Sequence, residues 1–321
     1  MDDPALEAEL LRDPLFDPDG GLTIAAPAGR GRGEWAGAPG AVAAEGVVHL
    51  SYRLRAPPPL RGHTVVISRS EDGVRFERVW QMSRDAIAAL SIERCAIVRT
   101  PDRWCLLVSF VAEADRRWRI EAIEADEIER LDPRSRRSAL LPEAIGVAGV
   151  KDPWVRRVGD AWQLFASFGP LPAGAGSDLH VTGDALSTGR TGSLTGLGTS
   201  RDLVEWEWRG AVLGPTPGRW DDHTARLTTA IRVGDEWVGL YDGSRVEGNY
   251  EERCGVAVSS DLVEWRKVSV DGPAIGTASG AGGVRYAELV EMPDGSVRAY
   301  YEFTREDGSH DLRTALSRNL L

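Results

Sequence analysis

The chain is poor in lysine and has no long apolar run. Of its 38 basic residues, only Lys151 and Lys267 are lysines, and neither follows the glycine that a phosphate-binding GxxxxGK[ST] loop requires. The GxSxG motif of serine hydrolases does not occur. No apolar stretch approaches the ~18 residues that a membrane-spanning helix needs. The sequence therefore argues against a P-loop protein, a serine hydrolase of the GxSxG type and a membrane protein.

Cysteine is also scarce. The three cysteines, Cys95, Cys105 and Cys254, are odd in number and have neither CxxC nor Cys/His ligand spacing. We therefore expect no disulfide framework and no structural metal such as zinc. The first ten residues are acidic, whereas a secretory signal starts with basic residues and continues with an apolar stretch. Together these features predict a cytoplasmic protein with reduced thiols.

Acidic residues outnumber basic ones, 49 to 38, so the formal net charge is −11. Nucleic-acid binding normally requires a basic face that displaces counterions from the phosphate backbone. We therefore expect no nucleic acid and no membrane among the partners. The sequence gives no prediction of an oligomeric state.

A short pattern recurs three times, in residues 70–76, 200–206 and 259–265. Each copy has Ser, then Asp, Val and an aromatic residue at successive steps of two. Ser and Asp favour a turn, and the alternating apolar residues favour a strand with one buried face. Asp72 and Asp202 are 130 residues apart, and Asp202 and Asp261 are 59 apart. A unit of about 60 to 65 residues therefore repeats about five times along the 321 residues.

Hairpin-like segments give the same count. Five stretches contain two short apolar runs separated by a polar or Gly-containing turn: 38–52, 93–110, 152–167, 226–241 and 286–301. An inner hairpin followed by an outer one makes four antiparallel strands, and radial repetition of such units gives a propeller. The sequence predicts an all-β fold, a five-bladed β-propeller of four-stranded antiparallel blades. Residues 1–19 form an N-terminal strap, and 20–321 form one propeller domain with a long Gly-rich insertion at 169–198.

These features resemble the five-bladed β-propeller glycosidases, that is, glycoside hydrolase families 32, 43, 62, 68 and 130. Over about residues 20–315, the resemblance rests on the Ser-x-Asp-Leu-x-x-Trp turns and on two segments, Lys151-Asp152-Pro153-Trp154-Val155 and Leu240-Tyr241-Asp242-Gly243. It implies that carboxylates at the starts of the inner strands in the first three blades carry the chemistry. The chain departs from that pattern in blade one, where Ala38 replaces the expected aspartate. The second blade offers Glu93, and the third has Asp152 where many relatives carry glutamate.

Cleavage of a glycosidic bond needs an acid for the leaving oxygen and a second carboxylate as base or nucleophile. We expect Glu93 to be the proton donor and Asp152 the second carboxylate, with Asp222 or Glu288 replacing the acid missing at position 38. The alternative for each is structural. Asp152 can belong to an Asp-Pro turn paired with its lysine neighbour, and any of these acids can pair with one of the 36 arginines (38 − 2).

Three tryptophans are expected at the rim, where an indole face can stack on a sugar ring: Trp35, Trp154 and Trp220. The other expected substrate-binding residues are His223, Arg226, Asp242, Arg285, Tyr286 and Glu302. The two arginines can hold a carboxylate or sulfate of a ligand or, equally, pair across blades. No cofactor is expected. A calcium ion in the central channel is the alternative considered for His223, whose more common role is that of a hydrogen-bonded rim residue.

The sequence therefore supports three hypotheses. The first is a glycoside hydrolase-like carbohydrate-active enzyme that cleaves a glycosidic bond of a small carbohydrate or glycosylated metabolite. The second is a propeller that binds such a ligand without cleaving it, which the alanine at position 38 favours. The third is a metabolite-tailoring enzyme that uses the glycosidase funnel for a non-hydrolytic step.

Overall fold

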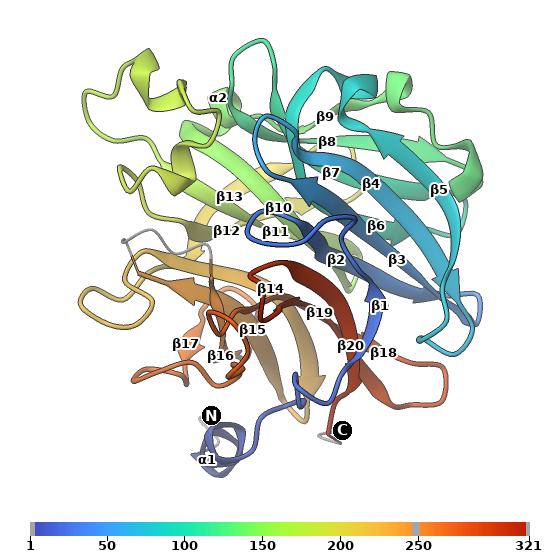
Figure 1. Ribbon diagram of the computed structural model, residues 1–321, viewed down its shortest axis with the longest axis vertical. Coiled ribbons are helices and arrows are strands. Elements are labelled where there is room, and N and C mark those ends of the chain that lie inside the picture. The colour runs from blue at the N-terminus through green and yellow to red at the C-terminus, as the bar shows by residue number, and fades with distance from the viewer. Residues whose placement is uncertain (1–3, 246–250, 319–321) are drawn as a thin grey trace.

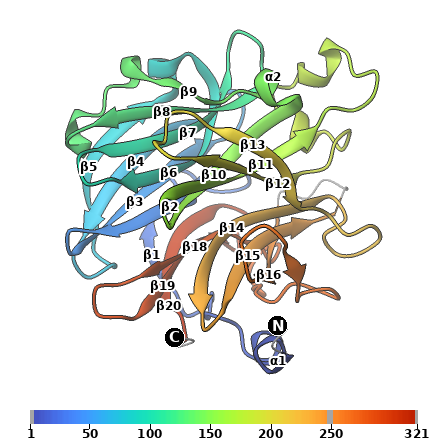
Figure 2. The same ribbon diagram turned by 180° about the vertical axis from the view of Figure 1, so that it is seen from behind.

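The computed structural model describes residues 4–245 and 251–318, and its strands surround a common axis (Figures 1 and 2). Blade 1 comprises β2 (Trp35–Ala44), β3 (Val47–Ala56), β4 (Arg61–Ser70) and β5 (Glu77–Ser83). Blade 2 comprises β6 (Ala89–Arg99), β7 (Trp104–Ala112), β8 (Trp118–Ala125) and β9 (Arg137–Leu140). Blade 3 comprises β10 (Val147–Val158), β11 (Ala161–Pro170), β12 (Leu194–Ser200) and β13 (Glu207–Leu213). Blade 4 comprises β14 (Thr224–Val233), β15 (Glu236–Ser244), β16 (Arg253–Ser259) and β17 (Arg266–Lys267).

Blade 5 closes the ring with a strand from the other end of the chain. It comprises β18 (Val284–Glu291), β19 (Val297–Thr304), β20 (His310–Leu316) and β1 (Leu22–Ala25), which pairs antiparallel with β20. A single parallel pair, Trp35 with His310, joins blade 5 to blade 1. The predicted all-β propeller of five four-stranded antiparallel blades is therefore confirmed.

Helices are short and lie outside the blades. The α-helices are α1 (Pro4–Arg12) and α2 (Pro142–Ile145). The 3-10 helices are η1 (Arg84–Ile87), η2 (Ile128–Arg130), η3 (Pro133–Ser135), η4 (Ser177–His180) and η5 (Ala185–Ser187). In the described part of the chain, no helix has the length and apolar character needed to cross a bilayer. The connection between β11 and β12 runs over 171–193, so it is shorter than the predicted insertion at 169–198, whose ends belong to the two strands.

The described part of the chain has six apolar cores, of which five lie mostly between neighbouring blades. Between blades 1 and 2, for example, Ile67 and Trp80 pack with Ile92 and Trp104. Complete burial of one large apolar side chain stabilises the fold by roughly 1.5–3 kcal/mol, so packing between blades is a main source of stability. The recurring Ser-x-Asp segments lie where the third strand turns into the fourth. There Asp202 accepts hydrogen bonds from the backbone N–H groups of Val204 and Glu205 at 2.8 and 3.0 Å.

Each inner strand carries one extra residue at the same height, and this irregularity positions the site. In β2, β6, β10 and β18, a β-bulge sets two residues against one of the second strand: 38–39, 93–94, 152–153 and 286–287. β14 has a related register shift between Leu227 and Thr229. A bulge bends its strand and re-aims side chains, so this repeated feature turns residues of several blades toward the propeller axis.

Candidate functional site

Three of the bulges begin with a residue in the left-handed backbone region. Ala38, Asp152 and Tyr286 have φ angles of 53°, 56° and 53°. For a residue with a side chain, this conformation costs roughly 1–2 kcal/mol. Such strain is maintained where the surrounding structure fixes the conformation, and it is common at functional sites. The three residues occupy equivalent positions in blades 1, 3 and 5. The Lys151-Asp152-Pro153 segment is therefore one instance of a feature that these blades share.

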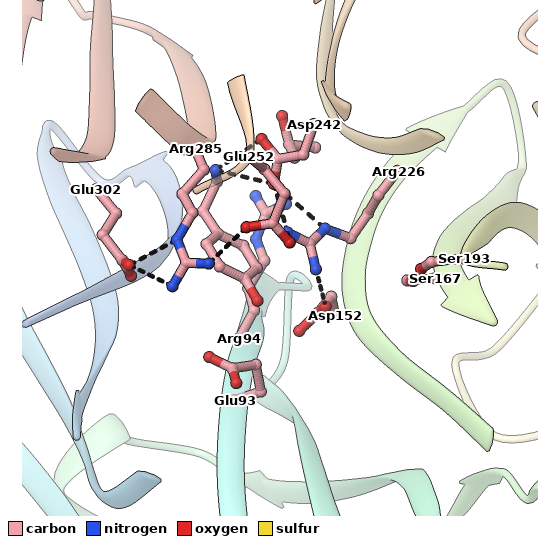
Figure 3. Close-up of polar contacts among 12 residues, drawn as sticks. Glu93, Arg94, Asp152, Ser167, Ser193, Arg226, Asp242, Glu252, Arg285 and Glu302 are labelled. Atoms are coloured by element: carbon pink, nitrogen blue, oxygen red, sulfur yellow. Dashed lines mark hydrogen bonds and ion pairs between the residues drawn. The ribbon is translucent and has the colours of Figure 1, made fainter. Parts of the chain in front are cut away.

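A continuous chain of ion pairs crosses this end of the propeller (Figure 3). Arg53 contacts both Glu93 and Glu302, and Arg285 links Glu302 to Glu252 at 2.7 and 2.5 Å. All five blades contribute to what we call the ion-pair belt, which consists of Arg53, Glu93, Asp152, Arg226, Asp242, Glu252, Arg285 and Glu302. All eight residues are buried.

Arg226 is the most highly connected member of the belt. Its guanidinium donates hydrogen bonds to Asp152 at 2.9 Å, to Asp242 at 2.7 Å and to Glu252 at 3.2 Å. Its guanidinium carbon also lies 4.2 Å from the ring centroid of Tyr286. This arrangement holds carboxylates from blades 3 and 4 in fixed positions around one cation (Figure 3).

Arginines lower the pKa of two carboxyl groups of the belt. Burial raises the pKa of Glu93, but Arg53 and Lys151 oppose burial and bring this pKa down to about 2. The pKa of Glu302 is well below its usual range because Arg285 and Arg53 outweigh the effect of burial. Glu93 is therefore an anion near neutral pH, which favours a role as acceptor over the expected role as proton donor.

Asp242 behaves differently because its carboxylate shares one guanidinium with other acids. Burial raises its pKa to about 6, and the nearby charge of Glu252 adds to this effect against the opposing Arg226. Both of its oxygens accept the backbone N–H of Tyr286, at 3.0 and 3.1 Å. Asp242 therefore supports the strained bulge of blade 5.

Asp152 presents an unused acceptor. Its Oδ2 binds Arg226 at 2.9 Å and lies 3.4 Å from the Lys151 ammonium, whereas Oδ1 is buried and has no hydrogen-bond partner in the structure. A buried acceptor without a partner costs roughly 1–3 kcal/mol, which a ligand hydroxyl could recover. The structural alternative for Asp152, pairing with Lys151, is present as well, but it leaves Oδ1 unoccupied.

Trp35 is not the open stacking platform that we expected. It is only 3% exposed and stacks on His310, with ring centroids 4.7 Å apart and an interplanar angle of 12°. The guanidinium carbons of Arg55 and Arg285 lie 4.4 and 4.5 Å from its ring. These cation–π contacts occupy the ring, so Trp35 holds Arg285 of the belt and the neighbouring Arg55 in place.

Trp154 and Glu288 lie deeper, in a second polar cluster that closes the central channel. Glu288 of blade 5 pairs with Arg94 of blade 2 and accepts hydrogen bonds from Trp154 and Thr229, each at 3.1 Å. Arg94 also donates to the carbonyl of Pro39 at 2.8 Å, so all five blades meet here. We call these five residues the channel plug. The expectation that Trp154 is a platform and Glu288 a funnel carboxylate is therefore wrong.

Burial raises the pKa of Glu288 to about 7, although Arg94 and two further hydrogen bonds oppose the shift. Beyond the plug, toward the opposite face, lies a cavity of about 340 Å³ lined in part by Trp154 and Glu288. Glu288 thus borders that cavity. Along β18 it follows Arg285 of the belt by three residues.

Three other expected residues lie on the outer rim of blade 4. The side chain of Asp222 is 22% exposed and 3.8 Å from Arg245, and Trp220 is half-buried. The backbone of His223 joins two blades, since its N–H donates to Ser244 and its carbonyl accepts from Ser193 at 3.0 and 2.9 Å. Across residues 4–245 and 251–318, no group of three or more His, Cys, Asp or Glu side chains could hold a metal ion, which leaves the calcium alternative without support.

Sequence reasoning missed the partners of the belt. Arg53 lies opposite the bulge of blade 1, and His310 bridges Glu302 at 2.6 Å and Glu251 at 3.3 Å. An alignment of the second strands would have identified Arg53. Like Asp242 and Glu302, it lies opposite a residue at or just before the irregularity of the inner strand. Glu252 precedes β16 and has no such signal.

Comparison with solved structures identifies the fold of the chain, whereas comparison of its sequence finds no match. No protein-family model matches the chain, and no curated protein matches it. Among solved structures, a glycoside hydrolase matches with a TM-score of 0.71 and 12% identity, covering 99% of this chain and 96% of that one. The β-1,2-mannobiose phosphorylase from Listeria innocua, in complex with β-1,2-mannobiose, matches with a TM-score of 0.62 and 15% identity, covering 95% of each chain.

A glycosyl hydrolase from Bacteroides ovatus also matches, with a TM-score of 0.63 and 13% identity, over 94% of this chain and 92% of that one. These matches extend over nearly the whole chain. The chain therefore has the five-bladed propeller fold of these glycoside hydrolases and phosphorylases, as the resemblance in its sequence implied.

Proposed function

We propose that this chain is a carbohydrate-active enzyme that binds a small glycoside at the ion-pair belt and cleaves its glycosidic bond. The observation that carries the proposal is the carboxylate of Asp152, which is held by Arg226 through one oxygen and offers the other, buried and without a partner. Sugars are recognised through hydroxyl groups that both donate and accept hydrogen bonds. A belt of alternating carboxylates and guanidiniums supplies both functions in a fixed geometry.

Preorganisation makes the belt effective for binding. Hydrogen bonds to charged groups contribute roughly 1.5–3 kcal/mol each, and side chains already fixed by ion pairs lose little further freedom when the ligand binds. The three guanidiniums of Arg53, Arg226 and Arg285 donate, and the carboxylates of Glu93 and Asp152 accept. We assign Asp152 as the reacting carboxylate, which acts as base or nucleophile, and Glu93 as an ionised acceptor of a sugar hydroxyl.

Tyr286 is the neutral donor that this site needs. Its ring lies close to the guanidiniums of Arg226 and Arg285. Burial raises the pKa of its phenol well above the usual value, and the negative charges of Asp152 and Glu93 add to this effect. The hydroxyl therefore keeps its proton at neutral pH, and we assign Tyr286 to give that proton to the leaving oxygen as the glycosidic bond breaks. The proton that the attacking water or phosphate releases then returns the phenol to its neutral form.

The cleaving reagent can be water or phosphate, and the two reactions are distinguished by their products. The experiment incubates the wild type with a panel of aryl glycosides and with β-1,2-mannobiose, each with and without inorganic phosphate, and identifies the sugar product as free sugar or sugar phosphate. We expect turnover by the wild type, and a loss of kcat/KM of at least about 100-fold in Asp152→Asn, because a reacting carboxylate typically contributes that much.

The matched control is Asp235→Asn, in the exposed turn between β14 and β15, which should retain full activity. Circular dichroism and thermal melting establish that each variant is folded. An Asp152→Asn protein that is folded and as active as the wild type would contradict the proposal.

A second candidate is a propeller that binds a carbohydrate without cleaving it. It is favoured by Ala38, which leaves the bulge of blade 1 without a carboxylate, and by the low pKa of Glu93, which burial opposes but Arg53 and Lys151 depress to about 2. Saccharide-induced stabilisation of the wild type that Asp152→Asn abolishes, with no product in either the presence or absence of phosphate, would establish this function instead.

A further inference from the structure

A hollow of about 810 Å³ opens beside the ion-pair belt, on the rim of blade 4. Its wall includes Ser244, two residues after Asp242 on β15, and Glu251, the residue next to Glu252. Glu251 accepts a hydrogen bond from Thr304 at 2.6 Å and lies 3.3 Å from His310, which in turn contacts Glu302 of the belt. Glu251 and His310 therefore connect the wall of the hollow to the belt.

The charges that line this rim hollow balance. Three guanidiniums and three carboxylates contribute to its wall: Arg219, Arg245, Arg253, Asp222, Glu251 and Asp271. An anionic ligand such as a phosphate or a uronate would gain from a surplus of cations, which the described residues of this wall do not supply. Equal numbers of donors and acceptors suit a neutral ligand rich in hydroxyl groups. The volume falls within the ~300–1,000 Å³ that is typical of small-molecule sites.

Trp220 gives the rim hollow an apolar surface. Its Nε1–H donates to the carbonyl of Ser269 at 2.7 Å, and its ring lies 5.7 Å from the ring of Tyr241 at an interplanar angle of 33°. The rest of the indole contributes to the wall of the hollow. The indole lies against Gly243, where a Cβ atom would come within 2.5 Å of two ring carbons. The glycine is thus required for the position of the ring. A fixed and half-buried indole is suited to stack on the C–H face of a sugar.

Asp222 supplies an acceptor next to this ring. Its Oδ1 is buried and has no hydrogen-bond partner, although its side chain as a whole is 22% exposed. The guanidinium Nε of Arg245 lies 3.8 Å from Oδ2, beyond hydrogen-bond distance. A hydroxyl of a ring stacked on Trp220 would satisfy Oδ1, in the same way as we propose for Asp152.

We propose that the rim hollow is a second sugar subsite, so that the ligand is at least a disaccharide, with one ring at the ion-pair belt and the next against Trp220 and Asp222. This inference rests on the proposed function, because the hollow would extend the same binding site. It assigns the substrate class as a neutral oligosaccharide, and it assigns selection for chain length to blade 4.

The experiment measures dissociation constants by calorimetry for matched saccharides: mannose, glucose, galactose, xylose and arabinose, each with its β-linked disaccharide. For the sugar that binds, we expect the disaccharide to bind at least about tenfold more tightly to the wild type. Trp220→Ala and Asp222→Asn should each remove most of this advantage and leave monosaccharide affinity unchanged. Trp220→Phe keeps an apolar ring and should retain most of the advantage, which keeps the test valid if the alanine variant does not fold.

The matched control is Trp206→Ala, another half-buried tryptophan with a bonded N–H, which lies at the blade 3 turn. It should leave both affinities unchanged. Equal affinities of the wild type for monosaccharide and disaccharide overturn the inference, as does an advantage that persists in folded Trp220→Phe, Trp220→Ala and Asp222→Asn proteins. In both cases the proposed function stands if Asp152→Asn weakens binding. Absence of any saccharide binding overturns the proposed function and this inference with it.

Discussion

Four inner strands, β6, β10, β14 and β18, contribute to both the ion-pair belt and the channel plug, yet the pKa values of Glu93 in the belt and Glu288 in the plug shift in opposite directions. Glu93 belongs to the belt and Arg94 to the plug, and Asp152 and Trp154 divide in the same manner on β10. In the belt, arginines outweigh burial and the pKa of Glu93 falls to about 2. In the plug, burial prevails over one arginine and the pKa of Glu288 rises to about 7.

The difference lies in the number of cations that each carboxyl faces. Glu93 lies in the field of Arg53, Lys151, Arg55 and Arg285, whereas Arg94 is the main cation that lowers the pKa of Glu288. One guanidinium does not compensate for removing a carboxylate from water, but several do. Neighbouring positions on the inner strands can therefore hold an ionised carboxylate in the belt and a carboxyl group that is partly protonated near neutral pH in the plug.

The largest effect is expected from removing the cation that three belt carboxylates share. Arg226→Met leaves Asp152, Asp242 and Glu252 buried without it, and breaking a single buried pair already costs about 3–5 kcal/mol. We expect a loss of more than about 4 kcal/mol in the free energy of unfolding, measured in urea. Arg232→Met, six residues further along β14 and half exposed, should cost less than about 1 kcal/mol. A loss below about 2 kcal/mol for Arg226→Met would show that the belt does not hold the blades together.

The second prediction is that replacing glutamate by glutamine changes the free energy of unfolding in opposite directions in the belt and in the plug. Glu93→Gln removes a carboxylate whose folded pKa is below the ordinary value of 4.5, and its stabilising contribution is present above about pH 4.5 and lost as the pH falls toward about 2. At pH 8 the variant should be less stable than the wild type by about 3 kcal/mol, since each pKa unit corresponds to 1.36 kcal/mol.

Glu288→Gln should have the opposite effect. The folded pKa is raised, so the wild type loses stability as the pH rises from about 4.5 to about 7, and the glutamine variant does not. At pH 8 the variant should therefore be more stable than the wild type by up to about 3 kcal/mol, and the two should converge near pH 4. Urea unfolding at pH 4 and pH 8 measures both variants. Destabilisation by Glu288→Gln at pH 8 would mean that the plug is an ionised pair like those of the belt.

The sequence predicts the architecture well because the architecture is a repeat. The Ser-x-Asp turns and the five hairpins recur at a spacing that only a five-unit ring explains, and Asp152 lies on a bulge that the blades share. The belt partners were missed because they are set by ring closure. Arg53 meets Glu93 across 40 residues, and Arg285 meets Glu252 across 33, between strands whose relative height no local pattern encodes. Trp154 was misplaced for the same reason, because two residues along β10 separate the funnel from the channel.

The smallest effect is expected within the plug itself. Thr229 donates to Glu288 at 3.1 Å and accepts the N–H of Leu289 at 3.2 Å, so it links blade 4 to blade 5 at the axis. Thr229→Val keeps the shape but removes both hydrogen bonds, and we expect a loss of about 1–2 kcal/mol in urea unfolding. Because the lost bond favoured the ionised form of Glu288, the decline of stability between pH 4.5 and 7 should also extend to higher pH. Thr228→Val, whose hydroxyl binds the carbonyl of Leu240 at 3.2 Å within blade 4, should leave that pH range unchanged. If both variants behaved alike, the plug would be a set of separate contacts, and the raised pKa of Glu288 would follow from its burial alone.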